Sequence, residues 1–95
     1  MQTELIIVKE YCQKSNLDPT FLGLLEEVGL IDFDIVEGER YIYASQLPRL
    51  EQYTRMYYDL SINIEGIDAI QHLLERIQRM QDDISQLQSR LRLYE

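Results

Sequence analysis

The sequence predicts a mainly α-helical fold with a small β-hairpin wing, namely a winged helix-turn-helix followed by a long C-terminal coiled-coil helix. Two observations support this prediction. Short apolar segments alternate with capping and turn residues over residues 1–62. Apolar side chains then recur at alternating steps of three and four over residues 63–95. We therefore expect a winged helix-turn-helix domain at 1–62 and a coiled-coil dimerisation helix at 63–95.

The N-terminal segment predicts a strand and two short helices. Leu5–Ile7 is a β-branched run that suits an edge strand, and residues 8–16 place apolar side chains at helical spacing. Asp18 and Pro19 then supply a capping side chain and a proline for the first turn of a second helix, which Gly29 ends. Two short helices joined by a three-residue bend are typical of a helix-turn-helix.

The middle of the chain predicts a hairpin and a third helix. Apolar and acidic residues alternate over 32–36, Gly38 suits a turn, and Tyr41 and Tyr43 belong to a second strand. The side chains of these two tyrosines are expected on the core face, with a role at an interface as the alternative. Ser45 is placed to cap the third helix. The apolar stripe of that helix consists of Leu47, Leu50, Tyr53, Tyr57 and Leu60.

The C-terminal segment predicts one long helix that pairs with a second chain. Asn63 can cap a helix from Ile64 to about Tyr94, which would be about 45 Å long, too long for a small domain to cover. A homodimer is the simplest cover. The alternative is that the helix folds back on the third helix, which Leu74 beside the stripe would favour. The expected dimerisation residues are Ile70, Leu73, Ile77, Met80, Ile84, Leu87 and Leu91.

The charge of the chain is unevenly distributed. The 95 residues include 17 acidic and 9 basic side chains, for a formal charge of -8. Nine acidic and two basic residues fall between Met1 and Glu39, so that part alone carries -7. Such a field opposes the approach of DNA, RNA or an anionic membrane. We expect no nucleic-acid or membrane partner, and instead a neutral or basic protein.

Several functional classes find no support in the residues. Cys12 and His72 are the only cysteine and histidine, so the sequence predicts no disulfide, metal site or cofactor, with Cys12 an inert core thiol and His72 solvated. No catalytic triad or glycine-rich phosphate loop can be built, and we expect no enzymatic activity. The start, MQTELIIVKE, lacks a basic leader region, and no stretch is long and apolar enough for a membrane span. These features predict a soluble, cytoplasmic protein.

Two stretches resemble the MerR-type fold. They are LIIVKEYCQKSNLDPTFLGLLEEVGLI at 5–31 and ERYIYASQLPRLEQYTRMYYDLSINIEGI at 39–67. The DNA-binding members of that family place arginines along the second helix, at positions that match Thr20 and Gly23 here. The family's usual aromatic pair is similarly replaced by Leu24-Leu25, with acidic residues following.

The chain also resembles the CbpM-type chaperone modulators, which are related to MerR. The matching residues are VKEYCQKSNLDPTFLGLLEEVGLI at 8–31, the wing, and LSINIEGIDAIQHLLERIQRMQDDISQLQSRLRLY at 60–94. This resemblance implies that the chain binds the J-domain of a CbpA/DnaJ-like co-chaperone. Binding would block the J-domain from stimulating DnaK. The alternatives are a MerR-like DNA-binding transcriptional regulator and an interaction module for another partner.

The acidic surface near the second helix and the wing is the expected contact with that partner, because J-domains engage DnaK through a basic helix face. The alternative is that these charges are merely solvated. One of the adjacent Leu24 and Leu25 could be an exposed contact, or both could belong to the core. The candidate partner-binding residues are Leu24, Glu26, Glu27, Asp32, Asp34, Glu37 and Glu39.

Overall fold

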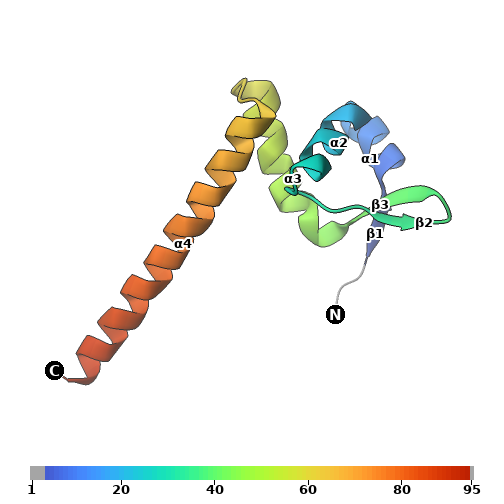
Figure 1. Cartoon of the computed structure of the whole chain (residues 1–95). Coiled ribbons are helices and arrows are strands. Elements are labelled where there is room, and N and C mark those ends of the chain that lie inside the picture. The colour runs from blue at the N-terminus through green and yellow to red at the C-terminus, as the bar shows by residue number, and fades with distance from the viewer. Residues whose placement is uncertain (1–3, 95) are drawn as a thin grey trace.

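The computed structural model describes residues 4–94, so the outermost ends of the two expected parts, 1–3 and 95, lie outside the described residues. The helix-turn-helix, the wing and the long C-terminal helix are confirmed (Figure 1). Pairing of the long helix into a coiled coil stays a prediction. The elements are β1 (Leu5–Ile7), α1 (Val8–Ser15), α2 (Pro19–Glu27), β2 (Asp34–Val36), β3 (Glu39–Tyr43), a 3-10 turn η1 (Ala44–Gln46), α3 (Leu47–Thr54), a π-helical turn η2 (Arg55–Asp59) and α4 (Ile64–Leu93).

The bend between α1 and α2 is built from local capping interactions. Asn16 follows α1 in the left-handed conformation, at a φ of 55°. The carboxylate of Asp18 accepts a hydrogen bond from the backbone N–H of Thr20 at 2.9 Å, and Pro19 occupies the first turn. Gly29, at a φ of 84°, follows the end of α2. These contacts confirm the predicted helix boundaries.

The three strands form one antiparallel sheet in the order β1-β3-β2, with β3 in the centre. Val36 pairs with Glu39 at the end of the hairpin, and the two residues between them, Glu37 and Gly38, have φ values of 52° and 79°. Positive φ at both central residues is typical of the type I′ turns that suit the twist of paired strands. The predicted wing is therefore confirmed, with a tight turn at its tip.

The expected core position of Tyr41 and Tyr43 is wrong. Ile42, between them, is fully buried and pairs with Ile6 of β1, while Tyr41 is half-buried and Tyr43 is exposed. Successive side chains of a strand point to opposite faces, so a core position for Ile42 turns both tyrosines outward. On that outer face the hydroxyl of Tyr43 donates a hydrogen bond to Asp34, with 3.2 Å between the oxygens.

The core lies between the sheet, the first three helices and the start of α4. The third of these helices differs from its prediction in two details. Ser45 is not a cap, because it lies within η1 and α3 begins with no side-chain capping bond among the described residues. Leu60 does not extend the apolar stripe and is 66% exposed. The π-helical turn before it adds a residue per turn and shifts the register of the stripe. The core residues are Val8, Cys12, Phe21, Leu22, Leu25, Ile31, Ile42, Leu50, Tyr53, Ile64 and Ile67.

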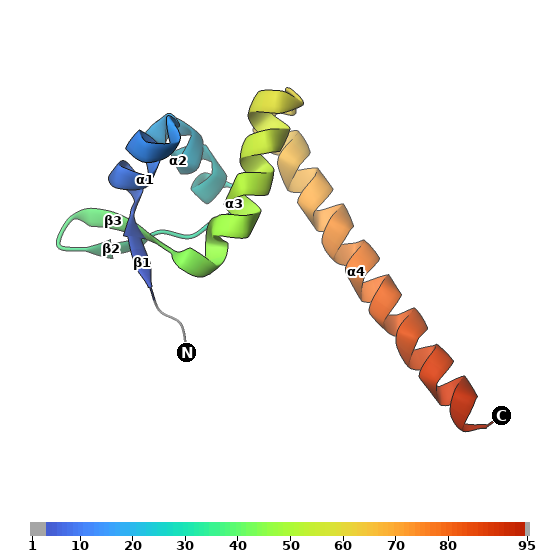
Figure 2. The same ribbon diagram turned by 180° about the vertical axis from the view of Figure 1, so that it is seen from behind.

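The long helix α4 starts in the core and then leaves the body (Figures 1 and 2). The side chain of Asn63 accepts a hydrogen bond from the backbone N–H of Gly66 at 2.7 Å, which confirms the predicted cap. At 30 residues the helix is about 45 Å long. The radius of gyration is 17.4 Å, whereas a compact chain of this length would have about 12 Å, because most of α4 projects from the body.

Two different faces of α4 are apolar. Near its start, Ile64, Ile67 and Gln71 are buried, so the fold-back alternative applies only to the first turns. At about 100° per residue the predicted seam lies on roughly the opposite side of the helix from these three residues. Ile70 is half-buried, and the other six seam residues are 49–61% exposed. A long apolar stripe on the side facing away from the body is thus left uncovered by the described chain.

Candidate functional site

The outward face of α2 carries no basic side chain. Phe21, Leu22 and Leu25 are buried, which leaves residues at spacings of three and four on the opposite side. That outward face consists of Thr20, Gly23, Leu24 and Glu27. It offers a hydroxyl group, bare backbone, an apolar side chain and a carboxylate, and α2 contains no lysine or arginine. This face cannot neutralise phosphate groups.

The structure separates the adjacent leucines of α2. Leu25 is fully buried, whereas Leu24 is 37% exposed. Of the two sequence interpretations, a core position for both leucines is therefore wrong, while a contact between Leu24 and a partner stays a prediction. A single exposed leucine is common on protein surfaces, so its meaning depends on whether neighbouring apolar side chains extend it into a patch.

Glu26 and Glu27 lie in the last turn of α2 and are both exposed. The C-terminal end of a helix carries a partial negative charge, so a carboxylate there is unfavourable by about 0.3–1 kcal/mol. No basic residue in the same turn compensates for them. Stability alone would favour cations at these two positions, and departures from local preference tend to mark functional sites.

A hollow of about 350 Å³ lies between α2 and the start of α4, and we call it the α2–α4 hollow. The ring of Tyr57 from η2 stacks on Phe21, with 4.7 Å between ring centroids. Val28 is 39% exposed, and Glu27 and Glu65 add carboxylates from the two helices. The lining residues are Leu24, Glu27, Val28, Tyr57, Asn63, Ile64 and Glu65.

Sequence reasoning identified Leu24 and Glu27 but missed Val28, Tyr57 and Glu65 as parts of this hollow. Val28 could have been found, because it lies four residues after Leu24 on the same side of α2. Tyr57 and Glu65 come from elements that are distant in the sequence. Only the packing of η2 and α4 against α2 brings them there.

On its other side, α2 meets the wing. A hollow of about 360 Å³ is lined by Pro19, Thr20, Gly23, Leu24 and Glu27 of α2 together with Arg40 of β3. The guanidinium of Arg40 lies 5.2 Å from the ring centroid of Phe33, a cation–π contact. Lys9 and Glu39 share a further hollow with Arg40. The cations that flank α2 on the wing side therefore share their surroundings with carboxylates.

The acidic residues of the wing and its approach lie apart from the end of α2. The main chain of Asp32 is bound to the side chain of Gln46, and Asp34 lies on the outer face of the sheet. Glu37 occupies the tip of the hairpin and Glu39 the start of β3, both exposed. The hydrogen bond that neutral Tyr43 donates to Asp34 raises the pKa of the tyrosine. The seven candidate residues thus form separate groups, with Leu24, Glu26 and Glu27 together at α2.

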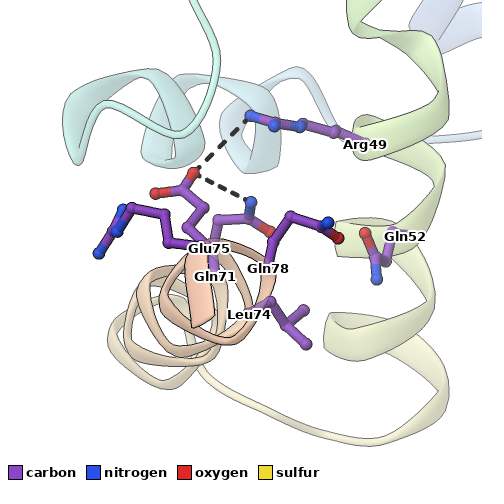
Figure 3. A pocket seen from close by; sticks show the side chains of 7 residues that line it. Arg49, Gln52, Gln71, Leu74, Glu75 and Gln78 are labelled. Carbon is purple, nitrogen blue, oxygen red and sulfur yellow. Dashed lines mark hydrogen bonds and ion pairs between the residues drawn. The ribbon is translucent and has the colours of Figure 1, made fainter. Parts of the chain in front are cut away.

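A polar groove of about 390 Å³ separates α3 from α4 (Figure 3). Glu75 lies between Arg49 and Gln71. One of its oxygens is 3.9 Å from the guanidinium of Arg49 and accepts a hydrogen bond from Gln71 at 3.2 Å. Both charged side chains are substantially exposed, so the ion pair adds little stability. Within the groove, the Arg49–Glu75 ion pair is a polar contact that joins α3 to α4.

The remaining chemically active side chains do not assemble into a site. Burial raises the pKa of the Cys12 thiol, which is unfavourable for a nucleophile. His72 is exposed beside Asp68, with 3.5 Å between the nitrogen and the carboxylate oxygen. Within residues 4–94 no three His, Cys, Asp or Glu side chains are grouped to hold a metal ion. None of the helices in that range has the length and apolar character needed to cross a bilayer.

Comparison with known proteins gives one match. A family model described as MerR HTH family regulatory protein matches residues 6–89, from β1 through most of α4. No curated protein and no solved structure matches the chain.

Proposed function

Because this chain belongs to the MerR HTH regulatory protein family, we propose that it uses that fold to bind a protein instead of DNA. The partner is the J-domain of a CbpA/DnaJ-like co-chaperone, and binding blocks the stimulation of DnaK. In this proposal the chain is a chaperone modulator of the CbpM type. The outward face of α2 carries the proposal, since it presents Leu24 and Glu27 and no cation.

Charge supports a basic protein partner. The segment from Met1 to Glu39 has nine acidic and two basic side chains. A J-domain approaches DnaK with a basic helix face, so an acidic surface of this kind competes for the same lysine and arginine side chains. Complementary charge also speeds encounter and disfavours polyanions.

The second candidate is DNA-binding regulation, which the description of the family model favours. Contacts to phosphate would fall to Lys9 and Arg40, which share a hollow beside α2. Glu39 lines the same hollow and Glu27 lines the next one, so both cations are partly offset. The first three helices and the wing add only Lys14 on α1 and Arg49 on α3, and so few cations would give weak binding at physiological salt.

Calorimetric titration with the J-domain of a co-chaperone from the same organism tests the proposal. We expect binding that weakens as salt rises from low to physiological concentration, together with loss of DnaK stimulation in an ATPase assay. A parallel anisotropy titration uses duplex DNA from upstream of the gene. Binding to DNA without binding to the J-domain would replace the modulator with the regulator.

Charge reversal separates the two acidic regions. We expect Glu26→Lys with Glu27→Lys to weaken J-domain binding while leaving stability unchanged or raising it, because cations suit the end of α2. Asp32→Lys with Asp34→Lys reports on the wing. Reversing Asp82 and Asp83, which are exposed on the projecting part of α4, gives a control with the same change in net charge. Wild-type affinity in both test pairs would place the interface elsewhere.

We propose in addition that the chain acts as a homodimer through the α4 seam. Six of its seven apolar residues are about half exposed or more in the single chain. A second copy would cover them with the alternating spacing of a coiled coil. The seam lies on the side of α4 that faces away from the body, so the pairing residues are distinct from those on the outward face of α2.

A further inference from the structure

We propose that the α2–α4 hollow is the anchoring point of the partner. It receives one apolar side chain from a basic helix of the J-domain. Glu27 and Glu65 at its rim pair with lysine or arginine side chains that flank the anchor. This inference rests on the proposed function, because the J-domain is the occupant that it names.

The floor of the hollow is apolar and open. Leu24 is 37% exposed, Val28 is 39% exposed, and Tyr57 and Ile64 continue the same surface. Its volume of about 350 Å³ lies at the lower end of the range of volumes that small-molecule binding pockets have. A hollow of this size takes an inserted side chain, which buries more apolar surface than a flat contact does.

The walls of the hollow are held in place before any partner arrives. Tyr57 contacts both Phe21 and Tyr58 in a cluster of three rings, with its ring centroid 4.7 Å from that of Phe21 and 5.0 Å from that of Tyr58. The capping bond that the Gly66 N–H donates to the Asn63 side chain fixes the first turn of α4, which contributes Ile64 and Glu65. Rigid pockets of this kind lose little conformational entropy on binding and are typical of interface hot spots.

The charges around the hollow select a basic occupant. Glu27 comes from α2 and Glu65 from α4, so carboxylates stand on both helices that form it. Glu26 is exposed next to Glu27 in the same turn. No lysine or arginine is among the lining residues. An apolar centre with a charged rim fits a helix that carries one apolar anchor between basic residues.

The hollow and the predicted dimer seam do not compete for the same surface. Ile64 lies on the side of α4 that faces the body, together with Ile67 and Gln71. Seam residues such as Ile77 and Ile84 lie on roughly the opposite side. A J-domain helix in the hollow and a second copy on the seam can therefore be bound together.

The test compares two kinds of variant in titrations with the J-domain at low and physiological salt. Leu24→Ala removes apolar contact only, so we expect binding about tenfold weaker or more with the same salt dependence. Glu27→Gln with Glu65→Gln removes only charge, so we expect weaker binding at low salt and a flatter salt dependence.

Matched controls use the same substitutions elsewhere. Leu93→Ala changes a side chain that is 83% exposed at the end of α4, and Glu10→Gln with Glu51→Gln changes two exposed carboxylates on α1 and α3. Both controls are expected to bind as the wild type does. Thermal melts of every variant establish that the fold is retained.

The outcomes separate this inference from the proposed function. If the wild type binds the J-domain and the Leu24 and double glutamine variants bind equally well, the hollow is not the anchoring point and the modulator function stands. If the wild type does not bind, the proposed function fails, and this inference fails with it. Weakening in the test variants but not in the controls supports both.

Discussion

Replacing Gly66 with alanine should destabilise the protein, although alanine is the better helix former. Helix propensity alone favours Gly66→Ala by about 0.5–1 kcal/mol. The structure opposes it, because an added Cβ would lie 2.8 Å from Cγ2 of Ile62 and 3.0 Å from Oδ1 of Asn63. That Asn63 oxygen is the acceptor of the capping bond at 2.7 Å.

The size of the effect follows from these contacts. Displacing the Asn63 side chain removes a cap worth about 1 kcal/mol. Moving Ile62, which packs against the core, adds an overpacking penalty of about 1–3 kcal/mol. After the gain in propensity is subtracted, we expect the free energy of unfolding to fall by about 1–3 kcal/mol.

Urea denaturation followed by circular dichroism checks this, with Gly23→Ala as the matched control. An added Cβ at Gly23 has nothing within 4 Å and lies within α2, so this variant should gain about 0.5–1 kcal/mol. Protein concentration is kept constant because a dimer would link stability to it. The reasoning is refuted if both alanine variants are stabilised to the same extent.

Three further outcomes are expected. Ile77→Asp with Ile84→Asp should give monomers in analytical ultracentrifugation, because an unpaired carboxylate in a coiled-coil seam is costly, and a folded dimer would show that the seam is misassigned. Glu37→Asn should raise the melting temperature, with a gain of up to about 1 kcal/mol, because asparagine tolerates the positive φ of 52° better than glutamate, and an unchanged melt would argue against strain in this turn. Burial raises the pKa of Tyr53 above its ordinary value of 10.0, so its stabilising contribution is complete below that pH and is lost as the pH rises through the folded-state pKa. Tyr53→Phe should reduce this loss of stability at alkaline pH. It should also stabilise the protein by about 1 kcal/mol at neutral pH, because the buried hydroxyl has no hydrogen-bond partner among the described residues. Denaturation curves at neutral and alkaline pH measure both effects.

The parts of the fold that the sequence predicted correctly are those that depend on near neighbours. The caps at Asp18 and Asn63 bind backbone groups two and three residues away, and Gly29 and Gly38 supply positive φ at a helix end and a turn. Such signals are complete within a few residues of sequence.

The errors concern choices that depend on distant contacts. Alternation along β3 showed that Tyr41 and Tyr43 share a face, but only packing against the helices turns Ile42 inward and both tyrosines outward. The exposed position of Leu60 follows from a π-helical turn, for which the apolar spacing contains no signal.

The candidate site could be predicted only in part for the same reason. Charge and the missing cations of α2 identified Glu27, and adjacency identified Leu24 as one of two alternatives. The other wall of the α2–α4 hollow comes from η2 and the start of α4. The turn through Ser61, which joins these two elements, places α4 against α2. No local pattern relates Tyr57 and Glu65 to a helix that ends at Glu27.

The bonds between Asp32 and Gln46 affect how α2 and the wing move relative to each other. The N–H of Asp32 donates to the Gln46 side chain at 2.8 Å, and its carbonyl accepts from the same amide at 3.0 Å. This exchange of two bonds resembles one rung of an antiparallel ladder, with a side chain in place of a strand. It ties the segment that leads from α2 to the wing onto the start of α3. The amide of Asp32 should consequently exchange slowly with solvent for a surface loop, and α2 and the wing should meet a partner as one stiff body whose shape is set in advance.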